Sequence, residues 1–164
     1  REQIITKDPC EVEALNRRLL AKLQAHRRDL ERVEIDRDPA ADAENGNHTL
    51  LIAYGTTAGA VRAARQRGRA EGLALSSAIV KSLWPLPERS LRVAADRASR
   101  IVVCELNPGL YAREVERLLP DRDIVRLNRL DGKLITPAQV LTVAGGAAAS
   151  ASDWVGSAGS PDSY

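Results

Sequence analysis

The strongest constraint on the fold of this chain is a pair of short, nearly continuous apolar runs, at residues 49–54 and 101–106. A strand with one face in water alternates apolar and polar residues, whereas a continuous run is typical of a strand covered on both faces. Gly55 allows a turn after the first run, and Pro108-Gly109 allows one after the second. We therefore expect strands of a parallel sheet that lies between two helical layers.

The rest of the central segment repeats this order of strand and helix. Further strands are predicted at 73–80 and 123–127, and helices at 58–69, 88–97, 111–119 and 137–143. Strand followed by helix, repeated along the chain, predicts an α/β fold with three layers and a mostly parallel sheet of about five strands.

A long amphipathic helix is predicted before the first of these strands. Asp8 is suited to cap it and Pro9 to occupy its first turn, and apolar residues then recur at three- and four-residue intervals up to Val33. Such a helix needs another surface to pack on. We divide the chain into a helical arm and linker (1–46), an α/β domain (47–144) and an Ala-, Gly- and Ser-rich tail (145–164), which we expect to be disordered.

The balance of charge excludes two classes of partner. Lys and Arg number 24 and Asp and Glu 22, which is too even for nucleic acid or an anionic membrane as the main partner. Acidic residues are interspersed among the arginines of the predicted arm, which favours a solvated or subunit-facing helix over a nucleic-acid arm. No apolar stretch reaches the ~20 residues of a membrane span, and no signal-peptide pattern is present, so we expect a cytoplasmic protein.

Aromatic residues are scarce, and their positions are informative. The chain has no Met and no Phe, two Trp and three Tyr. Its core must therefore be built from Ala, Val, Leu and Ile, and the missing Met indicates that Arg1 begins a fragment or a processed chain. Tyr54, Trp84 and Tyr111 each fall where a predicted strand ends or the following helix begins. Because aromatic residues are enriched in interfaces, we predict that this carboxyl edge of the sheet is a contact surface.

Residues of the kinds that bind metals or act as nucleophiles are few. Cys10 and Cys104 form no ligand pair, and His26 and His48 have no clustered partners, so no metal site is expected. Cys104 lies inside an apolar run and is interpreted as a buried thiol, while a disulfide between the two cysteines stays open. Ser76 has neither a G-x-S-x-G pattern nor a nearby histidine in the sequence, so no serine nucleophile is predicted.

Two loops at the carboxyl edge carry candidate binding residues. Gly55, Thr56 and Thr57 follow a strand and open a helix, where free backbone N–H groups can hold a phosphate or carboxylate. The alternative there is an ordinary turn with a Thr cap. Glu105 and Asn107 end the third strand, at the edge where α/β proteins bind ligands, so they can orient a polar ligand or bind a neighbouring chain. Their alternative role is local, to satisfy backbone groups of the turn that follows them.

Four short motifs occur in a fixed order along the chain: Ala53-Tyr54-Gly55-Thr56, Leu83-Trp84-Pro85-Leu86-Pro87, Val103-Cys104-Glu105-Leu106-Asn107-Pro108-Gly109 and Gly132-Lys133-Leu134-Ile135-Thr136-Pro137. In order and spacing they resemble the C-terminal part of the alpha subunit of 2-oxoacid:ferredoxin oxidoreductases, with the 2-oxoglutarate type closest. The resemblance implies the fold of the transketolase C-terminal domain. Leu86 and Leu110 depart from the family's usual Phe and Gln, which fits a divergent member or a related branch that acts on another 2-oxoacid.

The resemblance implies a role in assembly and in the wall of a ligand site. Such enzymes cleave a 2-oxoacid on thiamine diphosphate and Mg, pass electrons through iron–sulfur clusters to ferredoxin, and form an acyl-CoA. The glutamate that activates the thiamine ring lies in a preceding domain, and a chain with two cysteines cannot supply the four thiolates of a typical cluster. No catalytic residue and no cofactor are therefore expected on this chain alone. The expected interface or ligand-wall residues are Tyr54, Trp84, Glu105, Asn107 and Tyr111.

The implied partners are a beta subunit that carries thiamine diphosphate, the rest of the alpha subunit, and ferredoxin through the whole complex. The alternative is a free-standing α/β binding or protein-interaction module without catalysis. That alternative is motivated by the missing catalytic groups and by the candidate anion site at Gly55, Thr56 and Thr57.

Overall fold

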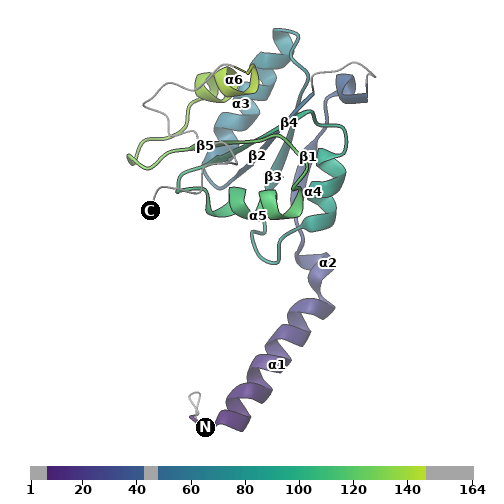
Figure 1. Ribbon diagram of the computed structural model, residues 1–164, viewed down its shortest axis with the longest axis vertical. Coiled ribbons are helices and arrows are strands. Elements are labelled where there is room, and N and C mark those ends of the chain that lie inside the picture. Colours follow the sequence, from purple (N-terminus) through teal and green to yellow (C-terminus); the bar gives the residue numbers. More distant parts are fainter. Residues whose placement is uncertain (1–6, 43–47, 147–164) are drawn as a thin grey trace.

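The computed structural model describes residues 7–42 and 48–146, which form a five-stranded sheet with helices on both faces and a helical arm that projects from it (Figure 1). In chain order the elements are α1 (Pro9–Ala25), α2 (Arg27–Leu30), β1 (Val33–Asp36), the 3-10 turn η1 (Pro39–Asp42), β2 (Thr49–Tyr54), α3 (Thr57–Ala70), β3 (Leu75–Val80), α4 (Glu88–Ala95), β4 (Arg100–Glu105), α5 (Leu110–Leu118), β5 (Ile124–Asn128) and α6 (Pro137–Ala144). Residues 147–164 of the expected disordered tail and 43–47 of the expected linker lie outside the described residues.

The sheet has the strand order β1-β3-β2-β4-β5. Strands β3, β2, β4 and β5 run parallel, and only β1 is antiparallel to its neighbour β3. The predicted α/β class and mostly parallel sheet of about five strands are thus confirmed. The expected strand at 49–54 coincides with β2, and the other three predicted strands overlap β3, β4 and β5.

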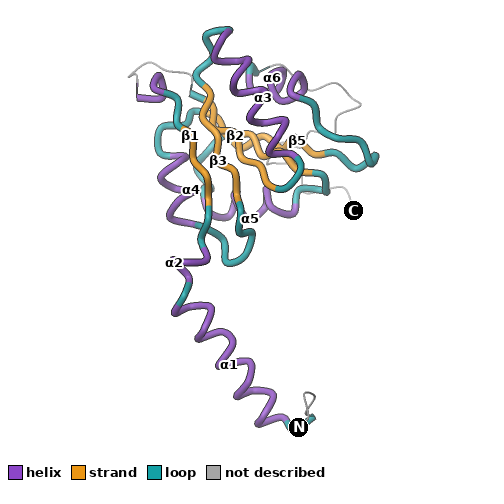
Figure 2. Tube along the Cα trace, turned by 180° about the vertical axis from the view of Figure 1, so that it is seen from behind, coloured by secondary structure: helices purple, strands orange, loops and turns teal. Residues whose placement is uncertain are grey.

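Two apolar cores lie on the two faces of the sheet, as the continuous runs of β2 and β4 require. One core joins the α4 and α5 face through residues such as Leu50, Leu91 and Val115, all buried. The other joins the α3 and α6 face through residues such as Leu51 and Val140. Figure 2 shows the same layers from behind, with the sheet between the two pairs of helices. Both cores are aliphatic apart from Tyr111 and the half-buried Tyr54.

Strand β1 corrects the prediction of an N-terminal helix that reaches Val33. The helix is broken at His26, and residues 33–36 pair with β3 instead. Long-range ion pairs hold this edge strand: Glu34 with Arg62 at 2.9 Å and with Lys81 at 3.2 Å, and Asp36 with Arg65 at 2.5 Å. Part of the expected arm and linker therefore belongs to the sheet. The division of the chain into arm, domain and tail stays a prediction.

The predicted start of the arm helix is confirmed. The Asp8 carboxyl accepts hydrogen bonds from the backbone N–H groups of Cys10 at 2.8 Å and of Glu11 at 3.2 Å, and Pro9 occupies the first turn. These contacts satisfy two of the N–H groups that a helix leaves unpaired at its start.

We expect Leu51→Ala to lower the free energy of unfolding by about 3 kcal/mol, because Leu51 is fully buried at the centre of the sheet and its truncation leaves a cavity. Urea-induced unfolding followed by circular dichroism measures the change. The matched control is Leu134→Ala at an exposed position, where we expect a change within about 0.5 kcal/mol. Equal losses in the two variants would contradict the position assigned to Leu51.

Candidate functional site

The candidate site lies where the chain changes direction across the sheet. The loop after β2 leads to α3 on one face, while the loop after β4 leads to α5 on the other. Since β2 and β4 are neighbours, their carboxyl ends form the point at which open α/β sheets bind ligands. Tyr54 ends β2 and Glu105 ends β4, so both were predicted at the correct edge.

Glu105 is fully buried beneath the first turn of α5. Its Oε2 accepts hydrogen bonds from the backbone N–H of Tyr111 at 3.0 Å and from the Tyr54 hydroxyl at 2.9 Å. Its Oε1 accepts the backbone N–H of Ala112 at 3.0 Å. A carboxyl group in this position replaces the cap that the sequence of α5 lacks, because Gly109 precedes the helix and has no side chain.

Asn107 completes the same network. Its Nδ2 donates to the Tyr54 hydroxyl at 2.6 Å, and its Oδ1 accepts the backbone N–H groups of Gly109 at 3.0 Å and Leu110 at 2.8 Å. Both side chains therefore satisfy backbone groups of the turn and of α5, which is the local role left open by the sequence. The network also fixes the shape of this edge: four of its bonds order the turn from β4 into α5, and the two bonds to the Tyr54 hydroxyl hold that turn against β2.

Two tyrosine rings pack over this network. Tyr54 and Tyr111 meet edge to face, with ring centroids 5.4 Å apart. Burial and, to a smaller extent, the neighbouring Glu105 carboxyl raise the pKa of Tyr54 to about 12. Burial also raises the pKa of Tyr111, whose buried hydroxyl has no hydrogen-bond partner among the described residues. Both phenols are therefore neutral donors or acceptors at physiological pH.

The loop at Gly55, Thr56 and Thr57 serves the backbone as well. The Thr57 hydroxyl donates to the carbonyl of Tyr54 at 2.7 Å and to that of Cys104 at 3.1 Å, which joins β2 to β4. Gly55 has a φ of +55°, which only glycine adopts at little cost. A hollow of about 210 Å³ lies beside this loop, and its lining includes Thr56 before α3, Thr57 at the start of α3 and Ile135 from the loop before α6. The predicted anion site stays a prediction.

Trp84 is brought to a different place from the two tyrosines. Its side chain is 76% exposed in the loop between β3 and α4, whereas Tyr111 is buried. Trp84 lines a groove with Leu20, Leu23 and Arg27 at the base of the arm. Of the three rings expected at the contact surface, it is the one whose side chain is largely open to a partner.

Sequence reasoning missed Asn128, which ends β5 at the same level as Glu105. Its side chain is buried, and neither amide atom has a hydrogen-bond partner among the described residues. A Cβ built on Gly109 would lie 3.0 Å from its Nδ2, so the glycine gives this amide its space. The sequence feature that could have identified Asn128 is its position as a polar residue directly after the predicted strand 123–127.

A contact between Ser76 and His48 corrects a second expectation. No histidine was expected to serve this serine, yet the Ser76 Oγ lies 2.7 Å from the His48 Nε2. The same Oγ accepts the backbone N–H of Asp38 at 2.9 Å. All three residues are buried. The contact therefore joins β3 to the segment before β2, and the serine has no access to a substrate.

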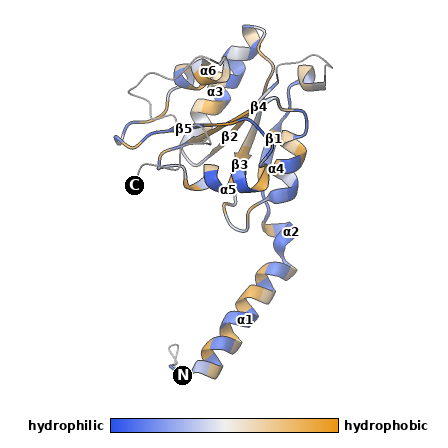
Figure 3. Cartoon of the chain, viewed as in Figure 1, coloured by the Kyte–Doolittle hydropathy of each residue, from blue (hydrophilic) through white to orange (hydrophobic). Residues whose placement is uncertain are grey.

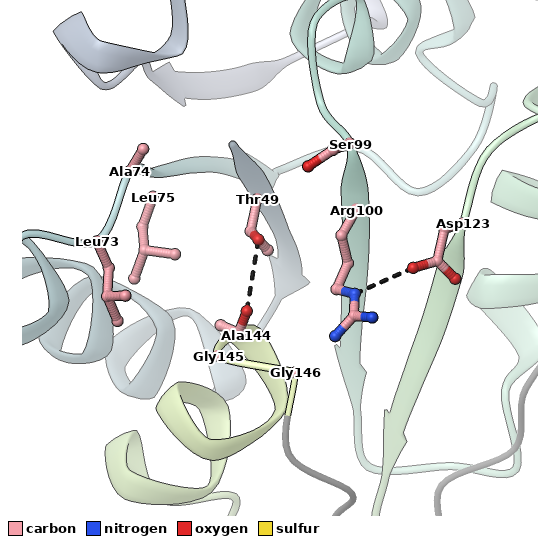
Figure 4. Close-up of a pocket in the computed structure, with 10 residues that line it drawn as sticks. All are labelled: Thr49, Leu73, Ala74, Leu75, Ser99, Arg100, Asp123, Ala144, Gly145 and Gly146. Carbon is pink, nitrogen blue, oxygen red and sulfur yellow. Dashed lines mark hydrogen bonds and ion pairs between the residues drawn. The ribbon is translucent and has the colours of Figure 1, made fainter. Parts of the chain in front are cut away.

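A cavity of about 340 Å³ opens at the opposite, amino edge of the sheet, where Figure 4 shows ten residues around it. Arg100 and Asp123 form an ion pair there at 3.0 Å, and the Thr49 hydroxyl lies 3.5 Å from the carbonyl of Ala144. The predicted site residues are all at the other edge. This cavity therefore gains no support from the sequence.

The described residues contain neither a disulfide nor a group of side chains that could hold a metal ion. Both cysteines are free, with Cys10 exposed and Cys104 buried, so the disulfide left open by the sequence is not formed. Burial raises the pKa of the Cys104 thiol to about 12, which keeps it protonated. Across residues 7–42 and 48–146 there is no group of three potential metal ligands. Within the same ranges, no helix has both the length and the apolar character to cross a membrane.

Comparison with known proteins gives one family and several relatives. The family described as pyruvate:ferredoxin oxidoreductase core domain II matches residues 48–140. The 2-oxoglutarate synthase subunit KorA of Methanothermobacter marburgensis is 28% identical over 130 residues, which cover 79% of this chain and 33% of that protein. The ketoisovalerate oxidoreductase subunit VorB of Methanothermobacter thermautotrophicus is 29% identical over 92 residues, or 56% of this chain and 26% of that protein.

Two solved structures share the fold. The 2-oxoglutarate:ferredoxin oxidoreductase from Magnetococcus marinus superposes with a TM-score of 0.65 and 22% identity, over 85% of this chain and 24% of its own. A split gene transketolase superposes with a TM-score of 0.56 and 19% identity, over 71% of this chain and 41% of its own. The expected transketolase-like architecture is thereby confirmed. The chain spans about a third of the length of the curated KorA relative that it matches.

We expect Glu105→Gln to lower the free energy of unfolding by about 1–3 kcal/mol, because a glutamine oxygen cannot accept all three hydrogen bonds and a buried N–H loses its partner. Urea titration measures this loss. In the control Glu114→Gln, a half-exposed side chain loses only its bond to Arg117, and we expect a change below about 0.5 kcal/mol. A Glu105→Gln variant as stable as the control would contradict the capping role.

The raised pKa of Tyr54 predicts a loss of stability at high pH. Its pKa is about 12 in the folded state and about 10 when unfolded, so the folded state binds its proton more tightly. The stabilising contribution is complete below pH 10 and is lost as the pH rises towards 12. We expect urea midpoints to fall more over this range in the wild type than in Tyr54→Phe. Parallel falls in the two proteins would count against a raised pKa at Tyr54.

Proposed function

The chain belongs to the family described as pyruvate:ferredoxin oxidoreductase core domain II, and we propose that it is the assembly and ligand-wall domain of a 2-oxoacid:ferredoxin oxidoreductase alpha subunit. The match over residues 48–140 is the observation that carries this proposal, since it includes β2 to β5 and the whole candidate site. Membership also confirms the resemblance drawn from the sequence motifs.

The proposed reaction of the whole complex is the oxidative decarboxylation of a 2-oxoacid to an acyl-CoA. The KorA relatives support 2-oxoglutarate as the substrate of the complex. The VorB relative, a ketoisovalerate oxidoreductase subunit, supports ketoisovalerate as the alternative substrate. Because the chain spans only a third of the KorA relative, we assign it one part of that activity. The remaining parts belong to the rest of the alpha subunit and to a beta subunit.

The residues of this chain do not fit an iron–sulfur cluster. A typical cluster needs four thiolates, whereas Cys104 is buried in the sheet and Cys10 lies on the arm. We propose that the clusters, thiamine diphosphate and Mg are carried by the partner chains. Thiamine diphosphate, when bound there, supplies the carbanion chemistry of decarboxylation.

The polar groups of the candidate site suit a wall better than a catalytic centre. The side-chain oxygens of Glu105 and Asn107 accept hydrogen bonds from backbone N–H groups of the β4–α5 turn. These two residues therefore position the loop. Tyr54 is held between them by two hydrogen bonds. We propose that this fixed loop presents a shaped edge to the neighbouring subunit or to a ligand at the subunit boundary.

Purification from the native host tests the proposal. We expect the subunit to copurify with a partner that carries thiamine diphosphate and iron–sulfur clusters, detected by cofactor analysis and visible absorbance. Titration calorimetry of the 164-residue chain with thiamine diphosphate, coenzyme A and nucleotides is the complementary measurement. Tight binding of one of these by the chain alone, with no such partner, would instead support a free-standing binding module.

We expect Trp84→Ala to reduce assembly with the partner subunit at least about tenfold, because a large exposed ring at an interface contributes much of the binding energy. Its free energy of unfolding should change by less than about 1 kcal/mol, since the side chain is mostly exposed. Copurification yield and urea titration measure the two effects. Leu134→Ala, at another exposed position, is the control, and equal losses of assembly and stability in Trp84→Ala would contradict the assignment.

A further inference from the structure

Helix α1 has no buried residue, although one of its sides is apolar. The large apolar side chains are between 36% and 58% exposed: Val12, Leu15, Leu19 and Leu23 recur at three- and four-residue intervals, and Leu20 follows Leu19 directly. We call this set the α1 stripe. Figure 1 shows the helix projecting away from the sheet, and Figure 3 shows apolar and polar residues alternating along it.

The α1 stripe is incompatible with a helix that stands alone in water. A helix of 17 residues is marginally stable without tertiary contacts, so most of its stability must come from packing of its apolar side. A hollow of about 630 Å³ lies at the end of the stripe nearest the domain, lined by Leu19, Leu23 and Leu30 with Lys22 and His26. Apolar residues that recur at three- and four-residue intervals are typical of a helix that packs along another helix.

The base of the arm is fixed to the domain, which keeps the stripe away from the sheet. Arg27 donates to the carbonyl of Leu86 at 3.1 Å and pairs with Glu88 at 3.1 Å. It also pairs with Glu31 at 2.7 Å, within the same segment. These contacts anchor α2 beside the start of α4. No buried residue occurs in α1 or α2, and the domain reaches only the end of the stripe, where Leu20 and Leu23 share a groove with Trp84.

The charges on α1 are divided along its length. The first turns are acidic, with Asp8, Glu11 and Glu13, and the second half is basic, with Arg17, Arg18 and Lys22. A parallel pair of such helices places like charges together. An antiparallel pair places the acidic first turns of each helix beside Lys22 of the other, while Arg17 stays paired with Glu13 of its own helix at 2.6 Å. Flanking charges of this kind set the orientation of paired helices.

We propose that α1 pairs in an antiparallel manner with α1 of a second copy of this chain. The pairing is isologous, because a twofold axis near the middle of the helix brings the α1 stripe of one copy onto the same stripe of the other. It buries the stripe and matches its two oppositely charged ends. The inference rests on the arm alone and not on the proposed function, so either can fail without the other.

Sedimentation equilibrium of the 164-residue chain tests the pairing. We expect a monomer–dimer equilibrium for the wild type and at least about tenfold weaker association for Leu19→Asp, because the charge falls within the stripe. The control is Val93→Asp on α4. Val93 is 56% exposed, against 49% for Leu19, and the control should associate like the wild type. Near-ultraviolet circular dichroism confirms that the domain stays folded in both variants.

Charge exchange tests the contacts between the two copies. Glu11→Lys and Lys22→Glu should each weaken self-association, because each substitution gives positions 11 and 22, which lie opposite each other in the antiparallel pair, charges of the same sign. An equimolar mixture should recover a heterodimer, since its opposed charges are again complementary. A helix that is merely destabilised by these substitutions would not be rescued by mixing.

The direction of pairing is measured at Cys10. It is exposed, and the other cysteine is buried, so a thiol-specific spin label reports on the arm. With a rise of 1.5 Å per residue, antiparallel pairing places the two labels roughly 20 Å apart, whereas parallel pairing places them at about 10 Å. A wild-type chain that stays monomeric, or a heterodimer with the short label distance, would overturn the proposal.

Discussion

The buried carboxyl group of Glu105 is the interaction on which the functional edge of this domain depends. It lies at the end of β4 and holds two N–H groups at the start of α5 and the hydroxyl of Tyr54 from β2. Three elements that are far apart in the sequence are thus joined at one side chain. A buried polar group is stable only when its partners are complete, so the position of the β4–α5 loop is set with little freedom.

In the proposed function, this fixed loop serves as a wall at a subunit boundary. The candidate binding groups at the carboxyl edge, the carboxyl of Glu105 and the amide of Asn107, are engaged with the backbone. The edge itself offers its shape to the outside, and the exposed ring of Trp84 lies apart from it, at the base of the arm. Membership of the core domain II family fits this role, because a rigid wall needs no reactive group of its own.

The sequence predicted secondary structure best for strands that are buried on both faces, and least well for segments held by contacts with residues far away in the sequence. The continuous apolar run of β2 predicted a strand covered on both faces, and its residues pack into two separate cores. The residues of β1 continue the amphipathic pattern of the arm, so a helix was predicted there. The strand forms because Glu34 and Asp36 pair with arginines on α3 and because its backbone pairs with β3. Glu105 and Asn107 were predicted at the correct edge, but only their geometry shows that they serve the turn.

The antiparallel edge strand has a mechanical consequence for the arm. Strand β1 follows α2 after two residues and is paired with β3 over four positions, from Val33 with Val80 to Asp36 with Ser77. Tension applied through α1 along the strand therefore reaches the sheet as shear across all these positions at once. The hydrogen bonds of a strand pair lie across the strand direction, so they resist such a load together instead of opening one by one. A partner that pulls on the arm is in this way coupled to the sheet itself.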